Sequence, residues 1–192
     1  MVMPIVAYIA KGILGIFFDK KYLSGKYFHE YKSGYVWAAK AIFHRNVLRL
    51  APPLPFPAAY GCNISNPKNI DFHVDDLHNF QGNGIYYQNF AAKITLGRNV
   101  FIAQNTALIT ANHDLTDPSK HAAGEEIIIE DNCWIGFGVV ILPGVRLGQG
   151  TTVAAGAVVT RSFPEGNCIL GGIPAVEIRK KTEDQKKPGK IL

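Results

Sequence analysis

A six-residue repeat runs from Leu96 to Val159 and constrains the fold more than any other feature of the chain. Each repeat begins with a large aliphatic residue, and the third residue after it tolerates a left-handed backbone. A period of six matches neither an α-helix nor a β-hairpin, and short-period self-similarity of this kind predicts a β-solenoid. The aliphatic positions are Leu96, Ile102, Leu108, Ile129, Ile135, Ile141, Leu147, Val153 and Val159.

Two further positions of the repeat predict how each coil is built. The corner positions are Asn99, Asn105, Asn132, Gly138, Gly144, Gly150 and Gly156. The small or β-branched positions that follow them are Val100, Thr106, Cys133, Val139, Val145, Thr151 and Ala157. We expect each repeat to form one strand and one corner, three repeats to close a triangular coil, and stacked coils to bury a continuous aliphatic column. A β-sandwich, the alternative, needs turn signals about every 8 to 12 residues.

One interruption separates Leu108 from Ile129. These residues are 21 positions apart, three more than the 18 of a full coil, and the segment between them is polar. We therefore expect a loop excursion over residues 109–128, and such loops on rigid scaffolds commonly carry function. His113 lies where the preceding strand should end, and a neutral imidazole there suits proton removal from a hydroxyl or amine. A surface or capping histidine is the simpler interpretation of this residue taken alone.

The composition says more about the partners and cellular compartment of the protein than about any reaction that it catalyses. The formal net charge is +5, and much of the excess lies near the two ends of the chain. No RNA- or DNA-binding motif accompanies it, so we expect no nucleic-acid partner, but a basic surface that could meet an anionic ligand or membrane. Cys62, Cys133 and Cys168 form no CxxC pair and indicate reduced thiols in the cytoplasm. Cys133 is expected to be a core residue.

The chain before the repeat predicts helices. Residues 1–18 are apolar apart from Lys11, which favours either a short helix packed on the solenoid end or peripheral membrane contact through residues 1–21. A second helix is expected over residues 35–50, stopped by two prolines. Its predicted polar stripe is Lys40, His44, Arg45 and Arg49. Its predicted apolar face is Trp37, Ala38, Ala41, Ile42, Val47 and Leu48.

These patterns divide the chain into three parts. We expect an N-terminal helical segment over residues 1–53, a β-solenoid domain over residues 54–179 with irregular first coils, and a basic, irregular tail over residues 180–192. The predicted fold class is therefore mainly β, with a helical appendage.

Five motifs in and around the repeat are Ile109-Thr-Ala-Asn-His-Asp114, Ile129-Glu-Asp-Asn-Cys-Trp-Ile-Gly136, Ile141-Leu-Pro-Gly-Val145, Ala155-Gly-Ala-Val-Val-Thr160 and Gly171-Gly-Ile-Pro-Ala175. Together they resemble the hexapeptide-repeat acyltransferases, in particular the maltose and galactoside O-acetyltransferases and the acetyltransferases of capsule and O-antigen clusters. The resemblance covers about residues 89–179. Residues 22–88 are similar to the polysaccharide-cluster members rather than to the maltose enzymes.

The resemblance implies a left-handed parallel β-helix, an exception to the usual right-handed crossover. It implies a homotrimer with active sites between subunits, acetyl-CoA as acyl donor, a sugar or glycan acceptor and no required metal. His113 would be the general base that takes a proton from a sugar hydroxyl, which attacks the thioester directly. A backbone N–H of a neighbouring coil would stabilise the oxyanion.

The resemblance also implies roles for other residues. The cofactor-binding residues would be Trp134, Phe137, Ala155, Thr160, Arg161 and Arg179. The substrate-binding residues would be Asn89 and Asp114. Phe137 replaces a small residue common in relatives, and the segment between Asn89 and Leu96 is about one repeat shorter than in the sugar enzymes. The group that orients the imidazole stays open among nearby acidic residues (Asp114, Asp117, Glu125 and Glu126) and a main-chain carbonyl.

Two other functions compete with acetyl transfer. A metal lyase resembling the γ-class carbonic anhydrases would place several histidines around zinc, and only His73 and His78, in the least regular segment, have suitable spacing. A non-catalytic trimeric scaffold would leave His113 without a chemical role. The acceptor, the choice between hydroxyl and amine, and the acyl chain length are left open by the sequence.

Overall fold

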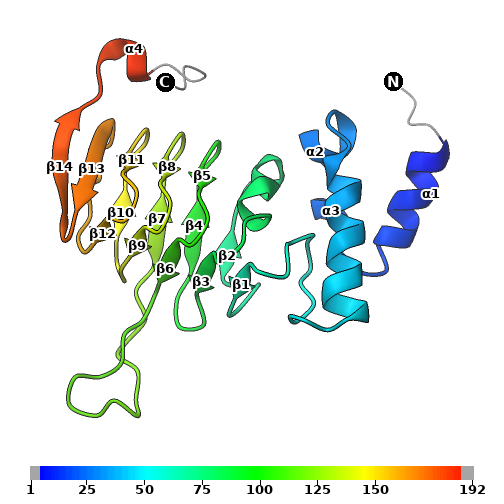
Figure 1. Cartoon of the computed structure of the whole chain (residues 1–192), viewed down its shortest axis with the longest axis horizontal. Coiled ribbons are helices and arrows are strands. Elements are labelled where there is room, and N and C mark those ends of the chain that lie inside the picture. Colours follow the sequence, from blue (N-terminus) through cyan, green and yellow to red (C-terminus); the bar gives the residue numbers. More distant parts are fainter. Residues whose placement is uncertain (1–4, 187–192) are drawn as a thin grey trace.

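The computed structural model of the chain describes residues 5–186 and contains a three-sided solenoid with helices at one end (Figure 1). Sheet A contains β1 (Asn63–Ile64), β3 (Tyr86–Gln88), β6 (Ala107–Ile109), β9 (Val140–Ile141) and β12 (Val158–Val159). Sheet B contains β2 (Ile70–Asp71), β4 (Ile94–Leu96), β7 (Ile127–Ile129) and β10 (Arg146–Leu147). Sheet C contains β5 (Phe101–Ile102), β8 (Trp134–Ile135), β11 (Thr152–Val153), β13 (Cys168–Gly172) and β14 (Ala175–Lys180).

The order of the strands confirms the predicted coil. Through the regular coils, each strand pairs in parallel with the strand three places later in the chain, so β6 pairs with β9 and β9 with β12. Three strands and three corners therefore make one coil. The stack ends where β14 turns back to pair antiparallel with β13. This mainly β, parallel arrangement is the predicted fold class.

The inward-facing residues of the repeat form the core. All nine aliphatic positions are buried, and so are all seven small positions, including Cys133. All seven predicted corner residues have positive φ, between 57° and 76°. The corner residues therefore adopt the left-handed conformation that Asn and Gly tolerate best.

Helices cover the N-terminal end of the stack (Figure 1). They are α1 (Ile5–Leu14), the 3₁₀ helix η1 (Lys20–Tyr22), α2 (Lys26–His29) and α3 (Ser33–Ala41), which continues as the π-helix η2 (Ile42–Val47). The 3₁₀ helix η3 (Val74–Phe80) lies within the irregular first coils, and α4 (Glu183–Lys186) follows β14. The predicted positions 1–4 and 187–192 of the helical segment and the tail lie outside the described residues.

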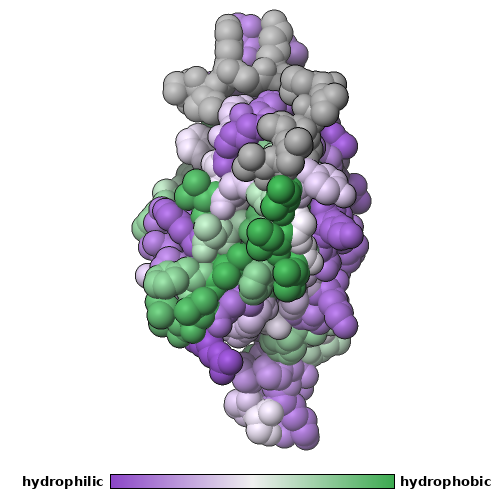
Figure 2. Space-filling model, turned by 90° about the vertical axis from the view of Figure 1, so that its right-hand side faces the viewer, coloured by the Kyte–Doolittle hydropathy of each residue, from purple (hydrophilic) through white to green (hydrophobic). Residues whose placement is uncertain are grey.

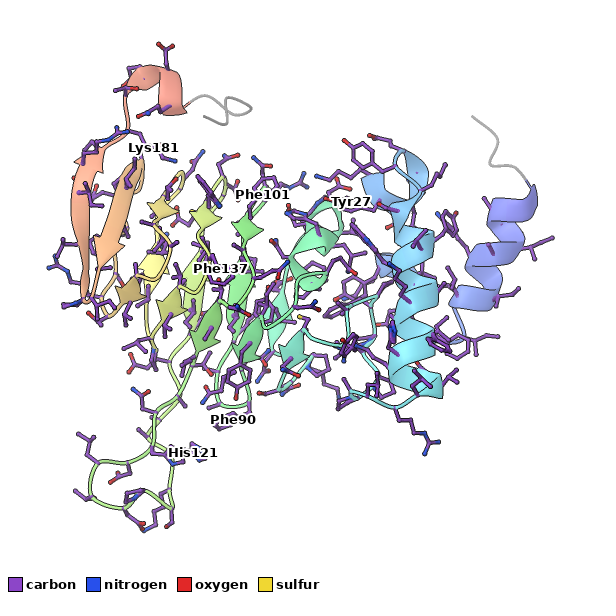
Figure 3. The ribbon with its side chains drawn as sticks, in the orientation of Figure 1. Tyr27, Phe90, Phe101, His121, Phe137 and Lys181 are labelled. Atoms are coloured by element: carbon purple, nitrogen blue, oxygen red, sulfur yellow. The ribbon has the colours of Figure 1, made fainter. Side chains whose placement is uncertain are left out.

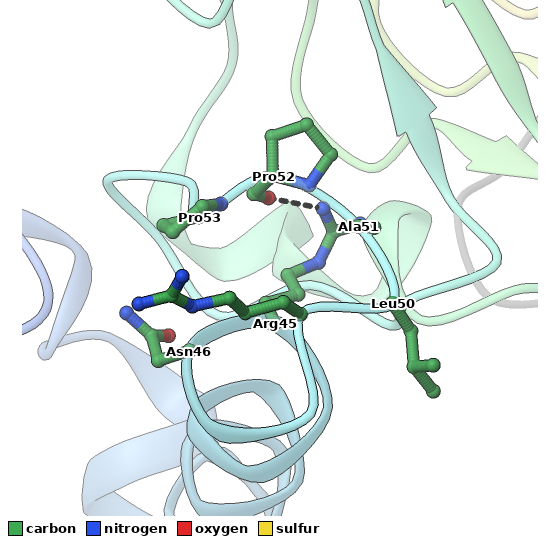
Figure 4. A pocket seen from close by; sticks show the side chains of 7 residues that line it. Arg45, Asn46, Leu50, Ala51, Pro52 and Pro53 are labelled. Atoms are coloured by element: carbon green, nitrogen blue, oxygen red, sulfur yellow. Dashed lines mark hydrogen bonds between the residues drawn. The ribbon is translucent and has the colours of Figure 1, made fainter.

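The π-helical turn changes which side of the second helix faces the core. The prediction that Arg45 is in a polar stripe was wrong, since its side chain is 3% exposed, and Val47 and Leu48, predicted to be apolar and inward, are exposed. The wider i→i+5 turns of η2 rotate the following side chains relative to a regular α-helix. The guanidinium of Arg45 donates to the carbonyl oxygens of Pro52 at 2.7 Å and Ala58 at 3.1 Å, beside a hollow of about 620 Å³ (Figure 4).

Within residues 5–186, no helix combines the length and apolar character that crossing a membrane requires.

Candidate active site

A loop leaves the solenoid after β6 and returns at β7, as the interruption of the repeat predicts. Figure 1 shows it projecting away from the coils. Two main-chain hydrogen bonds close its neck: the Asp114 N–H donates to the Lys120 carbonyl at 3.0 Å, and the Ala122 N–H donates to the Asn112 carbonyl at 2.9 Å. The neck is therefore a narrow antiparallel ribbon, and its two limbs are held in register.

Gln88 fixes the point at which the chain leaves sheet A. Its side-chain oxygen accepts hydrogen bonds from the N–H groups of Thr110 (3.0 Å) and Ala111 (3.1 Å), and its amide donates to the Ala111 carbonyl at 2.9 Å. The Thr110 hydroxyl donates to the Gln88 carbonyl at 2.7 Å. His113 therefore lies two residues after Ala111, in a stretch of backbone that hydrogen bonds to Gln88 hold in place.

The imidazole of His113 is oriented by a main-chain carbonyl. Its Nδ1 lies 2.7 Å from the Pro118 carbonyl oxygen, and a carbonyl oxygen can only accept a hydrogen bond. Nδ1 must therefore carry the proton, which leaves Nε2 of the neutral ring with a free lone pair. Because the residue is exposed, this lone pair can reach a substrate. Of the groups that the sequence left open as partners of the imidazole, the structure thus has a main-chain carbonyl in that place and not an acidic side chain.

The nearby acidic residues shape the tip of the loop instead. The carboxylate of Asp114 accepts hydrogen bonds from the hydroxyl of Thr116 and from the N–H groups of Thr116 and Asp117, which lower its pKa. Hydrogen bonds from the hydroxyl of Ser119, from Lys120 and from the Ser119 N–H likewise lower the pKa of Asp117. Asp114 is exposed enough to be a surface contact, but its carboxylate is already occupied by these turns.

Next to His113 lies a pair of aromatic rings that was not predicted from the sequence. The ring centroids of His113 and His121 are 4.4 Å apart with an interplanar angle of 31°, and Phe90 meets His121 edge to face at 4.9 Å. Figure 3 shows Phe90 and His121 side by side at the neck of the loop. His121 follows His113 by eight residues without a recognisable pattern, so only the pairing of the two limbs of the neck brings the two rings together.

Asn89 is not presented to the solvent. Its side chain is fully buried, its oxygen accepts from the Asn66 N–H at 2.9 Å and its amide donates to the Asn66 carbonyl at 2.7 Å. These bonds tie the turn after β3 to the coil before it. A substrate contact through Asn89 would require its amide to leave them.

Trp134 and Arg179, both predicted to bind the cofactor, lie in one row across sheet C. Trp134 is in register with Thr152, Thr152 with Ile169, and Ile169 with Arg179. Three strand spacings separate the ends of this row, about 14 Å in all. Both end residues are exposed, with Trp134 at 49%, so the row offers an extended outward surface with an aromatic and a cationic end.

Phe137 and Ala155 share the corner beside this row. The Gly156 N–H donates to the Phe137 carbonyl at 2.8 Å, which stacks the two corners on neighbouring coils. Gly136 is needed there, because a Cβ on it would lie 2.7 Å from the Ala155 nitrogen. Phe137 is 55% exposed and adds a second aromatic ring to this surface.

Thr160 and Arg161 lie at a different corner. They directly follow β12, which is two coils from β6 in sheet A, so they share the edge of the solenoid from which the His113 loop leaves. The Arg161 guanidinium lies over the ring of Phe163, 5.2 Å from its centroid. One chain therefore brings Thr160 and Arg161 to the edge of His113, but leaves Trp134, Phe137 and Ala155 on another side.

Metal ligands and thiols are the groups that the alternative chemistries would use. Within the described part of the chain, no three His, Cys, Asp or Glu side chains gather in a group that could hold a metal ion. All three cysteines are free and buried, and burial raises the pKa of Cys133 to about 12. Cys133 is therefore a core thiol, as predicted.

The chain matches the family described as bacterial transferase hexapeptide (six repeats) over residues 126–161. It is 41% identical over 133 residues to a Saccharomyces cerevisiae protein provisionally named an acetyltransferase, covering 67% of this chain and 62% of that protein. It is 34% identical over 128 residues to the galactoside O-acetyltransferase of Lactococcus lactis, covering 62% and 60%. The resemblance predicted from the sequence motifs is thereby confirmed, over less than two thirds of each relative's length.

The fold is also found in a solved acyltransferase structure. A mutant of AntD, an N-acyltransferase from Bacillus cereus, superposes with a TM-score of 0.51 at 16% identity, over 66% of this chain and 82% of that one. At this identity the likeness concerns the fold alone.

Proposed function

Because the chain carries the hexapeptide repeats of bacterial transferases, we propose that it is an acetyl-CoA-dependent O-acetyltransferase acting on a saccharide hydroxyl. The observation that carries the proposal is the exposed His113 at the root of the loop, whose Nδ1 is hydrogen-bonded to the Pro118 carbonyl so that Nε2 is the nitrogen left to act on a substrate. The names of the similar proteins support acetyl transfer, and the Lactococcus lactis relative supports a sugar acceptor. A capsule, O-antigen or exopolysaccharide precursor is the acceptor class that the sequence motifs favour.

The proposed reaction is a direct transfer. Nε2 of His113 takes the proton of the acceptor hydroxyl while the hydroxyl oxygen attacks the thioester carbonyl carbon of acetyl-CoA. The tetrahedral oxyanion accepts a hydrogen bond from a backbone N–H of a neighbouring coil. This intermediate then collapses, breaks the carbon–sulfur bond and expels the thiolate of CoA, which receives from His113 the proton that came from the acceptor hydroxyl. The products are a sugar acetate ester and CoA, without an acyl-enzyme.

We place the donor along the row from Trp134 to Arg179 and the corner of Phe137 and Ala155. An elongated thioester fits this surface, since Arg179 can meet phosphate oxygens and Trp134 can pack against the apolar chain. His113 lies at another corner of the same chain. We therefore infer that a second copy completes each site, in a homotrimer of left-handed solenoids.

The function is tested by thiol release from acetyl-CoA in the presence of a panel of free sugars, oligosaccharides and amino sugars. We expect release that depends on a sugar hydroxyl, with ester-linked acetate in the product by mass spectrometry. Hydroxylamine removes an O-acetyl group but spares an N-acetyl group, which separates the two products. Acceptor-independent release, or stoichiometric zinc together with carbon dioxide hydration, would refute the proposal.

We also propose that α1 makes the peripheral membrane contact expected from residues 1–21. α1 and the turn that follows it pack on the molecule through Leu14 and Phe18, while their outer side exposes Tyr8 (76%), Ile9 (55%) and Ile13 (56%) of the helix and Ile16 (78%) of the turn. Figure 2 shows apolar side chains gathered on this end of the molecule. A helix that is apolar on both sides favours burial of its outer side too.

The charge of the N-terminal segment supports an anionic lipid surface as the proposed partner. Residues 1–53 contain eight Lys and Arg, of which Arg45 is buried, but only two Asp and Glu, and basic residues beside an apolar helical face are typical of interfacial helices. We expect the protein to sediment with vesicles rich in phosphatidylglycerol, and the Ile9→Glu/Ile13→Glu variant to stay in solution. Leu115→Glu, in the distant loop, is the matched control. Equal sedimentation of the double variant and the control would refute the contact.

A further inference from the structure

We propose that Phe90 and His121 form a subsite that holds the apolar face of the acceptor sugar ring beside His113. The proposal rests on the proposed acetyl transfer and names the part of the site that selects its acceptor. For the rest of this section, the ring ledge means the side chains of Phe90, His121 and His113.

The ring ledge is continuous and open. The ring of His121 lies between the other two, 4.9 Å from the Phe90 centroid and 4.4 Å from the His113 centroid. Phe90 is 42% exposed although it is a large apolar side chain, and both histidines are exposed. The ledge therefore presents aromatic surface that leads directly to the proposed base.

A sugar ring suits such a surface. A pyranose presents C–H groups on one face and hydroxyl groups around its rim, and C–H groups pack well on the electron-rich face of an aromatic ring. Binding sites for small molecules combine apolar and aromatic walls with a few polar groups that fix orientation. Here the aromatic wall would hold the ring, and Nε2 of His113 would receive the hydroxyl at its rim.

The backbone holds the two parts of the ledge together. Phe90 lies in the turn after β3, whereas His121 lies in the returning limb of the loop. Between them Gly124 packs so closely on the turn that a Cβ would lie 2.6 Å from the Ala91 Cβ and 2.7 Å from its carbonyl carbon. Main-chain bonds of the neck, including the Ala122 N–H to the Asn112 carbonyl, hold His121 opposite His113. The ledge is thus built from two segments at a fixed distance.

The test measures KM and kcat for the best acceptor sugar and for acetyl-CoA. We expect Phe90→Ala and His121→Ala each to raise the KM for the sugar about tenfold, with the KM for acetyl-CoA unchanged. His121→Phe keeps a ring in place and should restore most of the affinity for the sugar. Leu115→Ala is the matched control, because Leu115 is fully exposed in the same loop and touches no ring of the ledge.

The outcomes separate the two levels of the proposal. An active wild-type protein whose sugar KM is unchanged in both alanine variants would overturn the subsite alone. A fall in kcat without a change in sugar KM would also overturn it, because His121 would then only position His113. A wild-type protein that acetylates no sugar would overturn the proposed function and the subsite with it.

Discussion

At the scale of single residues, one main-chain atom decides what His113 can do. The Pro118 carbonyl accepts from Nδ1 and so leaves Nε2 as the basic nitrogen. In many histidine bases a carboxylate has this orienting role and also stabilises the charged ring. A neutral carbonyl orients the ring without an added negative charge.

Gly138 tests the corner rule of the repeat. Its φ is +66°, and a Cβ would meet no atom within 4 Å. Gly138→Ala should therefore lower the free energy of unfolding by about 1 to 2 kcal/mol through backbone strain alone. Gly138→Asn should cost less, since Asn99, Asn105 and Asn132 adopt this conformation at equivalent corners. Urea unfolding of both variants measures the difference, and equal losses would contradict the rule.

His78 predicts a pH dependence of stability. Its ring lies 4.7 Å from the ring of Phe101, and burial, with Lys26 nearby, lowers its pKa to about 4. Between pH 6.5 and 4 the unfolded chain binds a proton that the folded chain does not. The free energy of unfolding therefore decreases as the pH is lowered through this window, by about 3 kcal/mol at most. His78→Phe should remove this part of the slope in urea unfolding at several pH values. An unchanged slope would contradict the assignment.

The corner and core residues of the repeat could be read from the sequence, because their roles depend only on local backbone shape and on the period. Arg45 and Asn89 could not. Both look like surface residues in the sequence, but their hydrogen-bond partners come from turns 7 to 23 residues away. Their burial is decided by where those carbonyl and N–H groups point, which no periodic pattern encodes.

At the scale of elements, the neck of the loop after β6 is held in a defined position by contacts with the solenoid and between its own limbs. Gln88 fixes its start, the neck bonds fix its width, and Gly124 fixes its return against Ala91. The interruption of the repeat predicts the position of this loop, but not its internal pairing. The closeness of His121 to His113 follows from that pairing and was therefore missed.

Gly124 provides the test at this scale. Gly124→Val should push the returning limb away from Ala91 and, through the hydrogen bonds of the neck, shift His113 as well. We expect kcat to fall at least tenfold, because small displacements of a base are costly to proton transfer. The solenoid core does not contain this residue, so the thermal midpoint should change little. Ala123→Val, at the exposed neighbouring position, is the control and should leave kcat unchanged. Equal kcat values for the two variants would show that the close packing has no role.

At the scale of the whole molecule, one chain carries two separated halves of the proposed site. His113 lies on the edge between sheets A and B, and the row containing Trp134 lies on sheet C. The sequence indicates both halves through its motifs. The resemblance implies sites between subunits, but the motifs alone do not show which residues lie on which side of the solenoid, because that follows from which strands stack in which sheet.

Complementation between subunits tests this separation. His113→Ala and Trp134→Arg are each expected to be inactive, the first without its base and the second with its donor row blocked. Co-expressed with different tags and purified through both, the mixed assemblies should regain part of the activity, because some sites combine an intact half from each chain. Assemblies that contain both variants and remain inactive would place the whole site within one chain.

The central claim is that His113 is the base of acetyl transfer, and the transfer rate of His113→Ala tests it most directly. General bases contribute about 10²- to 10⁴-fold to rate, so we predict a fall in kcat of that size at pH 7.5. Acetyl-CoA binding, measured by calorimetry on the same preparation, should stay within about twofold of the wild type. A variant that binds acetyl-CoA and transfers acetyl groups at the wild-type rate would contradict the account.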